Sequence, residues 1–263
     1  MKMHISTTLT SIALRNWDCK VNSNLLSMKP RLEISKRQLM LKIGENSMRD
    51  KVIKAIEDNK IITIVRSIGS DKLIPLAEAM YNGGIRLLEV TFSADGHISD
   101  EETAENIRML AEHFEDRMYI GAGTVLSEKQ VELTKKAGGK FIISPDTYEN
   151  VIKKTLELGM VSIPGALTPT EIQIANRMGA DFVKMFPAVN MGCEYVKAVL
   201  APLSNTKLLA VGGINENNMT DYLKAGISGF GIGSNIINKK LVENNDYKEI
   251  TELAKKYVKE IKQ

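Results

Sequence analysis

From residue 49 onward, short aliphatic runs alternate with amphipathic stretches of about a dozen residues. This alternation is typical of βα units, in which each strand of a parallel sheet is followed by a covering helix. We count eight such units. The predicted strands are Ile61 to Val65, Arg86 to Thr91, Met118 to Ala122, Phe141 to Ser144, Val161 to Ile163, Phe182 to Met185, Lys207 to Val211 and Gly229 to Ile232.

The amphipathic stretches predict helices, and several have recognisable ends. Ser127 and Thr168 are candidate N-caps, Pro169 suits a first helical position, and glycines such as Gly138 follow the last turn. A leading helix and a closing helix are expected to complete the ring. The predicted helices are Arg49 to Asp58, Asp71 to Tyr81, Asp100 to Phe114, Ser127 to Ala137, Thr147 to Leu158, Thr168 to Met178, Glu194 to Leu200, Glu216 to Ala225 and Tyr247 to Ile261.

Eight βα units predict an α/β fold, a single-domain (βα)8 TIM barrel spanning residues 48–263. A doubly wound open sheet is the alternative architecture. It is disfavoured because no GxGxxG motif follows the first strand, where a dinucleotide-binding half requires one.

Residues 1–47 show no sustained period of 2 or 3.6 and are expected to form a disordered N-terminal extension. They hold eight Lys or Arg and three Asp or Glu, a net charge of +5 within a total of +3. Two origins remain open. The segment is a basic presequence, or the translation start is assigned too far upstream and Met48 is the natural first residue.

Composition excludes several classes of protein. The barrel segment has no basic excess to favour nucleic acid, and no apolar run approaches the roughly 18 residues of a membrane helix. Cys19 and Cys193 lie far apart, which favours a reducing, cytoplasmic location. His4, His97 and His113 form no metal-binding pattern, so we expect no metal.

The second predicted strand, RLLEVT, contains a charged residue among apolar ones. Because side chains alternate along a strand, Glu89 shares a face with Leu87 and Thr91 and is expected to point into the barrel. A structurally paired glutamate is the alternative to a catalytic one.

The sixth predicted strand, DFVKMFPA, places Lys184 on the face shared with Phe182 and Phe186. A structural role is a poor explanation for a lysine inside an aliphatic barrel, because desolvating an ammonium is costly and lysine is rarely buried unpaired. A free lysine is neutral about once in a few thousand molecules at pH 7, whereas burial favours the neutral amine that attacks a ketone. Lysine and glutamate inside one barrel therefore favour imine chemistry, with Glu89 shuttling protons, and an ion pair between the two is the alternative.

Polar and glycine residues at strand ends are candidate ligand-binding groups, because barrel active sites lie at the carboxyl ends of the strands. Arg66 follows the first strand and is a candidate for binding an anion through its guanidinium group; the alternative is a solvated loop arginine. Thr124 in GAGT binds substrate or caps a turn, and the glycines beside it let a ligand approach the backbone. Glycine loops after the seventh and eighth strands predict a phosphate site, with simple tight turns as the alternative: Gly212, Gly213, Gly233 and Ser234.

From about residue 49 to the end, the chain resembles the family of 2-dehydro-3-deoxy-phosphogluconate / 4-hydroxy-2-oxoglutarate aldolases. The motifs that carry the resemblance occur in order as IVRS, GIRLLEVTF, GAGTVL, FIISPDT, SIPGALTPTEI, ADFVKMFPA, AVGGI and GIGS. The resemblance implies a barrel, a pyruvate-forming class I aldolase without metal or cofactor, and usually a homotrimer.

Carried over by position, Lys184 matches the Schiff-base lysine and Glu89 the general acid/base. Thr124 matches a residue near the pyruvyl carboxylate, and the loops at Gly212, Gly213 and Ser234 match the phosphate-binding loops. One departure concerns the pattern EVTLR, because this chain reads EVTFS with Ser93 in place of the arginine. Arg66 is then the expected substitute. The remaining candidate substrate-binding residues are Thr91, Pro145 and Phe186, and Asp146 is a second departure that could affect specificity.

The sequence thus predicts cleavage of 2-dehydro-3-deoxy-6-phosphogluconate to pyruvate and glyceraldehyde 3-phosphate. The galactonate epimer and unphosphorylated 4-hydroxy-2-oxoglutarate are alternative substrates. A non-catalytic phosphosugar-binding barrel is the alternative of a different class.

Overall fold

The computed structural model describes residues 48–262. The predicted N-terminal extension, residues 1–47, lies outside the described residues. Within residues 48–262, no helix is both long and apolar enough to cross a membrane.

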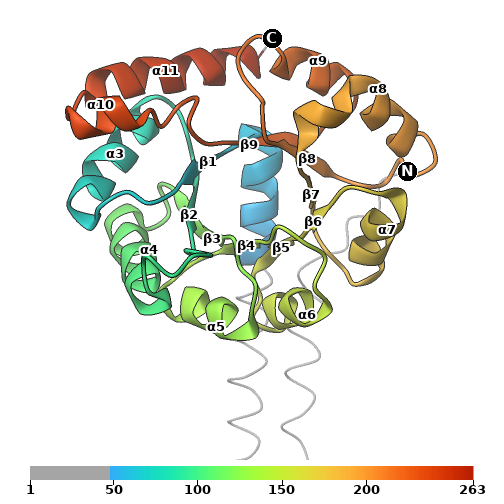
Figure 1. Ribbon diagram of the computed structural model, residues 1–263, viewed down its shortest axis with the longest axis horizontal. Coiled ribbons are helices and arrows are strands. Elements are labelled where there is room, and N and C mark those ends of the chain that lie inside the picture. Colours follow the sequence, from blue (N-terminus) through green and yellow to red (C-terminus); the bar gives the residue numbers. More distant parts are fainter. Residues whose placement is uncertain (1–47, 263) are drawn as a thin grey trace, which may run out of the picture. The chain divides into compact units, whose positions relative to one another are not determined.

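A ring of parallel strands forms the centre of the domain (Figure 1). Nine strands are hydrogen-bonded in the order β5-β4-β3-β2-β1-β9-β8-β7-β6. They are β1 (Ile61–Val65), β2 (Leu87–Thr91), β3 (Tyr119–Gly123), β4 (Phe141–Ile143), β5 (Val161–Ile163), β6 (Gly165–Ala166), β7 (Val183–Met185), β8 (Leu208–Val211) and β9 (Gly229–Ile232).

The strands β5 and β6 are two parts of one segment that is interrupted only at Pro164. β5 pairs with β4, and β6 pairs with β7. Lys184 N donates to the Pro164 carbonyl (2.8 Å), and Asp181 N donates to the Ser162 carbonyl (3.0 Å). This segment therefore joins both ends of the sheet, which confirms the predicted TIM barrel.

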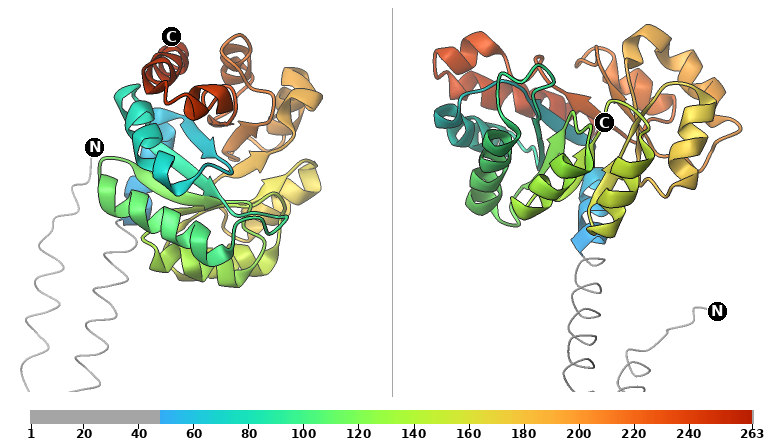
Figure 2. Two further views of the ribbon diagram at one scale, coloured as in Figure 1. Left: turned by 60° about the vertical axis from the view of Figure 1, so that its left-hand side comes forward. Right: turned by 60° about the horizontal axis from the view of Figure 1, so that its bottom comes forward.

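The helices surround the strands, as the views in Figures 1 and 2 agree. Two predicted N-caps are confirmed: the side chain of Ser127 accepts from Gln130 N, and Thr168 forms a capping box with Glu171. The helices are α3 (Ser70–Asn82), α4 (Asp100–Phe114), α5 (Glu128–Lys136), α6 (Glu149–Glu157), α7 (Pro169–Arg177), α8 (Ala188–Leu200), α9 (Met219–Lys224), α10 (Lys239–Glu243) and α11 (Tyr247–Glu260).

The helical residues 48–59 differ from the prediction that they belong to the outer ring. In Figure 1 this helix crosses the centre of the ring of strands. Val52 and Ile56 pack in one apolar cluster with strand residues that point into the barrel, among them Leu87 and Leu209. The helix therefore plugs the amino-terminal end of the barrel, and we call it the plug helix.

A polar contact also fixes the plug helix. The guanidinium of Arg49 donates to the carboxylate of Asp181 (2.6 Å), which also accepts from Ser162 N (2.9 Å). Apolar packing and this ion pair close the end of the barrel opposite the carboxyl ends of the strands. The open end is therefore the end that carries the predicted site residues.

Candidate active site

Glu89 on β2 and Lys184 on β7 both point into the barrel, as their strand alternation predicts. Two positions earlier along the chain, Leu87 on β2 and Phe182 directly before β7 belong to the inner apolar cluster. The side chains are deeply buried, with exposed fractions of 2% for Glu89 and 8% for Lys184. In the order of the strands, β9, β8 and β1 separate β2 from β7, so the carboxylate and the amine face each other across the barrel.

Burial shifts the pKa of both groups toward their neutral forms. Desolvation raises the pKa of Glu89, against the opposing effects of the positive charges of Lys184 and Arg66. Desolvation also lowers the pKa of Lys184, where Arg66 adds to the effect and Glu89 opposes it. In the described part of the chain, no hydrogen bond or ion pair joins these two side chains. The amine is thus available to a small molecule in the barrel mouth.

A glycine on the neighbouring strand makes room for the glutamate. A Cβ atom added to Gly123 on β3 would lie 1.4 Å from Glu89 Oε1 and 2.2 Å from its Cδ. The sequence suggests that glycines here let a ligand approach the backbone. At Gly123 the group that makes this approach is the carboxylate of Glu89.

Arg66 and Thr124 lie together at the rim. Arg66 follows β1, Thr124 follows β3, and the guanidinium Nη2 donates to Thr124 Oγ1 at 3.4 Å. Thr124 (φ 55°) and Ser67 (φ 53°), the residue after Arg66, both adopt the left-handed conformation. This conformation costs a non-glycine residue energy and is frequent at functional sites.

The predicted phosphate loops follow β8 and β9 at the same end of the barrel. Gly212 and Gly213 adopt φ values of 93° and 78°, and added Cβ atoms would meet Phe186 at 3.2 Å and Val189 at 2.3 Å. Their glycine identity therefore has a structural cause.

Gly233 differs, because its φ is not in the left-handed region and an added Cβ would meet nothing closer than Ile64 at 3.7 Å. Neither backbone conformation nor packing requires a glycine here. The adjacent Ser234 is exposed, and no residue in 48–262 hydrogen-bonds its hydroxyl.

The other predicted binding residues also lie at the mouth. Thr91 is the next inward-facing residue of β2 after Glu89 and is buried. Phe186 is 45% exposed, and its ring centroid lies 5.1 Å from Lys184 Nζ. Pro145 is exposed, and its carbonyl oxygen would be 2.3 Å from a Cβ added to Gly165. The site residues predicted from the sequence are thus brought to one end of the barrel.

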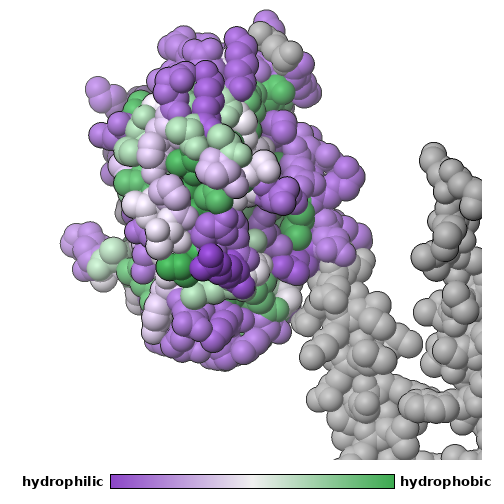
Figure 3. Space-filling view, turned by 90° about the vertical axis from the view of Figure 1, so that its right-hand side faces the viewer, coloured by the Kyte–Doolittle hydropathy of each residue, from purple (hydrophilic) through white to green (hydrophobic). Residues whose placement is uncertain are grey.

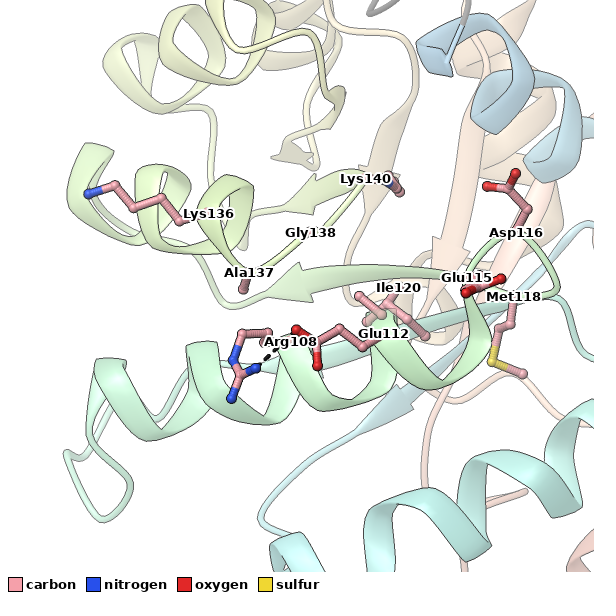
Figure 4. A pocket seen from close by; sticks show the side chains of 11 residues that line it. Arg108, Glu112, Glu115, Asp116, Met118, Ile120, Lys136, Ala137, Gly138 and Lys140 are labelled. Atoms are coloured by element: carbon pink, nitrogen blue, oxygen red, sulfur yellow. Dashed lines mark hydrogen bonds and ion pairs between the residues drawn. The ribbon is translucent and has the colours of Figure 1, made fainter.

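A surface cavity of about 270 Å³ lies near the amino ends of β3 and β4, away from this mouth (Figure 4). It is lined by charges of both signs, and Arg108 within it is hydrogen-bonded to Glu112 (2.9 Å). None of the predicted site residues lines it. Across residues 48–262, no group of three or more His, Cys, Asp or Glu side chains is placed to hold a metal ion.

Comparison with known proteins finds relatives that share most of this chain. The family model described as KDPG and KHG aldolase matches residues 52–253. Here KDPG stands for 2-dehydro-3-deoxy-6-phosphogluconate and KHG for 4-hydroxy-2-oxoglutarate. A 2-dehydro-3-deoxy-phosphogluconate aldolase of Haemophilus influenzae is 33% identical over 214 residues, 81% of this chain and 97% of that protein. A 2-dehydro-3-deoxy-6-phosphogalactonate aldolase of Escherichia coli is 31% identical, over 67% of this chain and 83% of its own length.

Solved structures agree with the sequence relatives. A structure of KDPG aldolase from Legionella pneumophila, with pyruvate captured as a covalent carbinolamine intermediate, is 29% identical with a TM-score of 0.69. The match covers 76% of this chain and 95% of that one. A cage designed by fusing symmetric oligomeric domains is also 29% identical with a TM-score of 0.69, over 77% of this chain and 72% of that one.

Proposed function

Because the chain belongs to the KDPG and KHG aldolase family, we propose that it cleaves 2-dehydro-3-deoxy-6-phosphogluconate through a Schiff base on Lys184. The protein is an aldolase, a carbon–carbon lyase. This excludes the alternative of a non-catalytic sugar-binding barrel. The observation that carries the proposal is a nearly buried amine, of lowered pKa, across the barrel from a buried carboxyl group of raised pKa.

In the first step, neutral Lys184 Nζ attacks the C2 ketone of the substrate. The carbinolamine then loses water, and Glu89 supplies the proton that leaves with the hydroxyl group. Burial favours both reactive forms, the neutral amine and the protonated carboxyl. The resulting iminium ion carries a positive charge adjacent to C3.

In the second step, Glu89, now a carboxylate, removes the proton from the C4 hydroxyl. The C3–C4 bond breaks, its electron pair moves toward the iminium nitrogen, and the aldehyde leaves. The enamine that remains is protonated at C3, and hydrolysis of the imine consumes one water molecule and releases pyruvate. Overall, one substrate molecule gives pyruvate and glyceraldehyde 3-phosphate, and Lys184 is regenerated.

Two anionic groups of the substrate need partners. We assign the carboxylate to Arg66 and Thr124, since the guanidinium and the hydroxyl are already joined at the rim. We assign the phosphate to the loops at Gly212, Gly213, Gly233 and Ser234. Gly233 supports this assignment, because ligand access is the remaining reason for a glycine there.

Chemical trapping tests the central step. Borohydride added with pyruvate should inactivate the enzyme and add the mass of a reduced pyruvyl group to the peptide that contains Lys184. Lys184→Ala should abolish both the adduct and turnover. The Schiff-base proposal is wrong if pyruvate and borohydride leave activity intact.

Substrate preference requires a separate test. Ser234→Asp places a negative charge against the phosphate, so KM should rise far more for the phosphorylated acids than for 4-hydroxy-2-oxoglutarate. Equal effects on both would remove the case for a phosphate site in this loop. Assays with the gluconate and galactonate epimers compare the remaining alternatives.

We propose a homotrimer in the cytoplasm. The oligomeric part of this proposal is supported by the similarity to a cage designed from symmetric oligomeric domains and by several exposed large apolar side chains. One face with hydrophobic residues among hydrophilic ones is seen in Figure 3. Sedimentation velocity measures the oligomeric state. The exposed apolar residues are Leu126, Tyr148, Ile174, Phe186 and Val189.

A further inference from the structure

A second cavity, of about 140 Å³, lies between the loops that follow β1 and β2, directly beside the candidate active site. Thr91, the inward-facing neighbour of Glu89, forms part of its wall, and so does Arg66. The cavity therefore adjoins the barrel mouth at Thr91 and at Arg66, which we assign to the substrate carboxylate. The loop after β2 contributes Ser93 and Asp95 to the lining.

The polar lining of this cavity is fixed by hydrogen bonds within the loop. Asp95 Oδ1 accepts from the hydroxyl of Ser93 and from His97 N (3.3 Å). These bonds lower the pKa of Asp95, so the group is an ionised acceptor at neutral pH. Asp95 Oδ2 accepts no hydrogen bond in the described part of the chain and has only His97 Nε2 nearby, at 3.8 Å.

Arg66 and Asp95 line the same small cavity without pairing with each other. The guanidinium donates to Thr124 instead, and within residues 48–262 no ion pair joins Arg66 to Asp95. Opposite charges that face one cavity without contact can be bridged by a ligand with an acceptor at one end and a donor at the other. A sugar acid has this character, because its carboxylate can bind Arg66 while a hydroxyl group farther along the carbon chain donates to Asp95.

We propose that Asp95 is a specificity-determining residue that accepts a hydrogen bond from a hydroxyl group of the aldehyde half of the substrate. The proposal rests on the proposed aldolase function. It selects polyhydroxylated sugar acids over 4-hydroxy-2-oxoglutarate, whose aldehyde half ends in a second carboxylate and offers no further hydroxyl. A site that hydrogen-bonds a substrate hydroxyl discriminates strongly against an analogue that lacks it. The negative charge of Asp95 also disfavours a second carboxylate at this place.

Three substrates separate the hydroxyl from the phosphate: the phosphorylated six-carbon acid, the same acid without phosphate, and 4-hydroxy-2-oxoglutarate. Asp95→Ala should lower kcat/KM about tenfold or more for both six-carbon acids and leave it unchanged or higher for hydroxyoxoglutarate. Asp95→Asn keeps a neutral acceptor and should give an intermediate loss. Asp116→Asn, an exposed acid near the amino ends of the strands, serves as the matched control and should change none of the three values.

The outcomes also separate this inference from the proposed function. If kcat/KM rises equally for all three substrates in Asp95→Ala, the residue acts only by charge repulsion and accepts no hydroxyl. If the values for the six-carbon acids do not fall, the inference is wrong while pyruvate trapping on Lys184 still stands. Failure of trapping in the unaltered enzyme overturns the proposed function instead.

Discussion

Gly123→Ala tests whether catalysis depends on where the carboxylate of Glu89 lies. The added Cβ would be 1.4 Å from Glu89 Oε1, whereas an ordinary contact needs about 3.4 Å. The carboxylate must therefore move by about 2 Å. A displacement of 1 Å in a reacting group can cost 10²-fold in rate, so kcat for cleavage should fall by roughly 10²-fold or more. KM should change little, because the groups that we assign to substrate anions are untouched.

A double-mutant comparison makes the test specific. Glu89→Gln removes the proton shuttle and should itself lower kcat by roughly 10²-fold. If Gly123→Ala acts through the same carboxylate, the double variant should be no slower than the slower single variant. Gly121→Ala is the matched control, because its Cβ would lie 2.3 Å from the ring of Phe141 instead. Gly121→Ala should lower Tm by overpacking, and it should lower kcat less than Gly123→Ala does.

The reasoning is refuted in two cases. Gly123→Ala with a kcat near that of the unaltered enzyme would show that proton transfer does not need Glu89 in this position. Losses that multiply in the double variant would show that the two residues act independently. Assays should be coupled to pyruvate reduction and run well below the Tm of each variant.

Three further predictions use other parts of the molecule. Arg66→Lys keeps the charge but loses the planar fork, so kcat/KM should fall tenfold or more, and an unchanged Arg66→Ala would contradict the carboxylate assignment. Lys184→Met should raise Tm, because the folded-state pKa of the amine is below its unfolded value of about 10.4. Between these two pKa values the unfolded chain binds more protons than the folded chain. The stability of the unaltered enzyme relative to Lys184→Met should therefore rise with pH across that window. A stability difference that does not change with pH would contradict this prediction. A chain that begins at Met48 should keep its activity and its Tm within about 2 °C, and a larger loss would show that residues 1–47 stabilise the barrel.

Strand alternation alone is sufficient to orient the proposed catalytic pair, Glu89 and Lys184, toward the barrel interior. β1 and β5 begin and end where the aliphatic runs of the sequence do, and Glu89 and Lys184 point inward as a period of 2 requires. Alternation is reliable here because strands in a barrel have one face toward the interior and the other toward the helices.

The sequence is less informative where position depends on contacts between distant segments. The helix α10 has only five residues, too few for a period to be visible, and the pattern does not predict it. The pattern assigns the plug helix to the outer ring, since amphipathicity shows that a helix buries one face but not which partner covers it. The role of Gly123 also could not be predicted from the pattern, because it depends on a side chain from another strand. Asp95 carries no signal in its own sequence context beyond its nearness to Ser93.

The plug helix also has a consequence for how the chain is made. It is synthesised before every strand of the barrel, yet it packs against Phe182 and Leu209, which belong to the last third of the sequence. Arg49 and its partner Asp181 are separated by 132 positions. At a ribosomal rate of roughly 5 to 20 residues per second, Val52 and Ile56 wait on the order of 7 to 26 s for that part of their binding surface. For about half of its translation, the nascent chain therefore lacks the partner that covers the apolar face of this helix, and this interval is when a chaperone that recognises such helices would act.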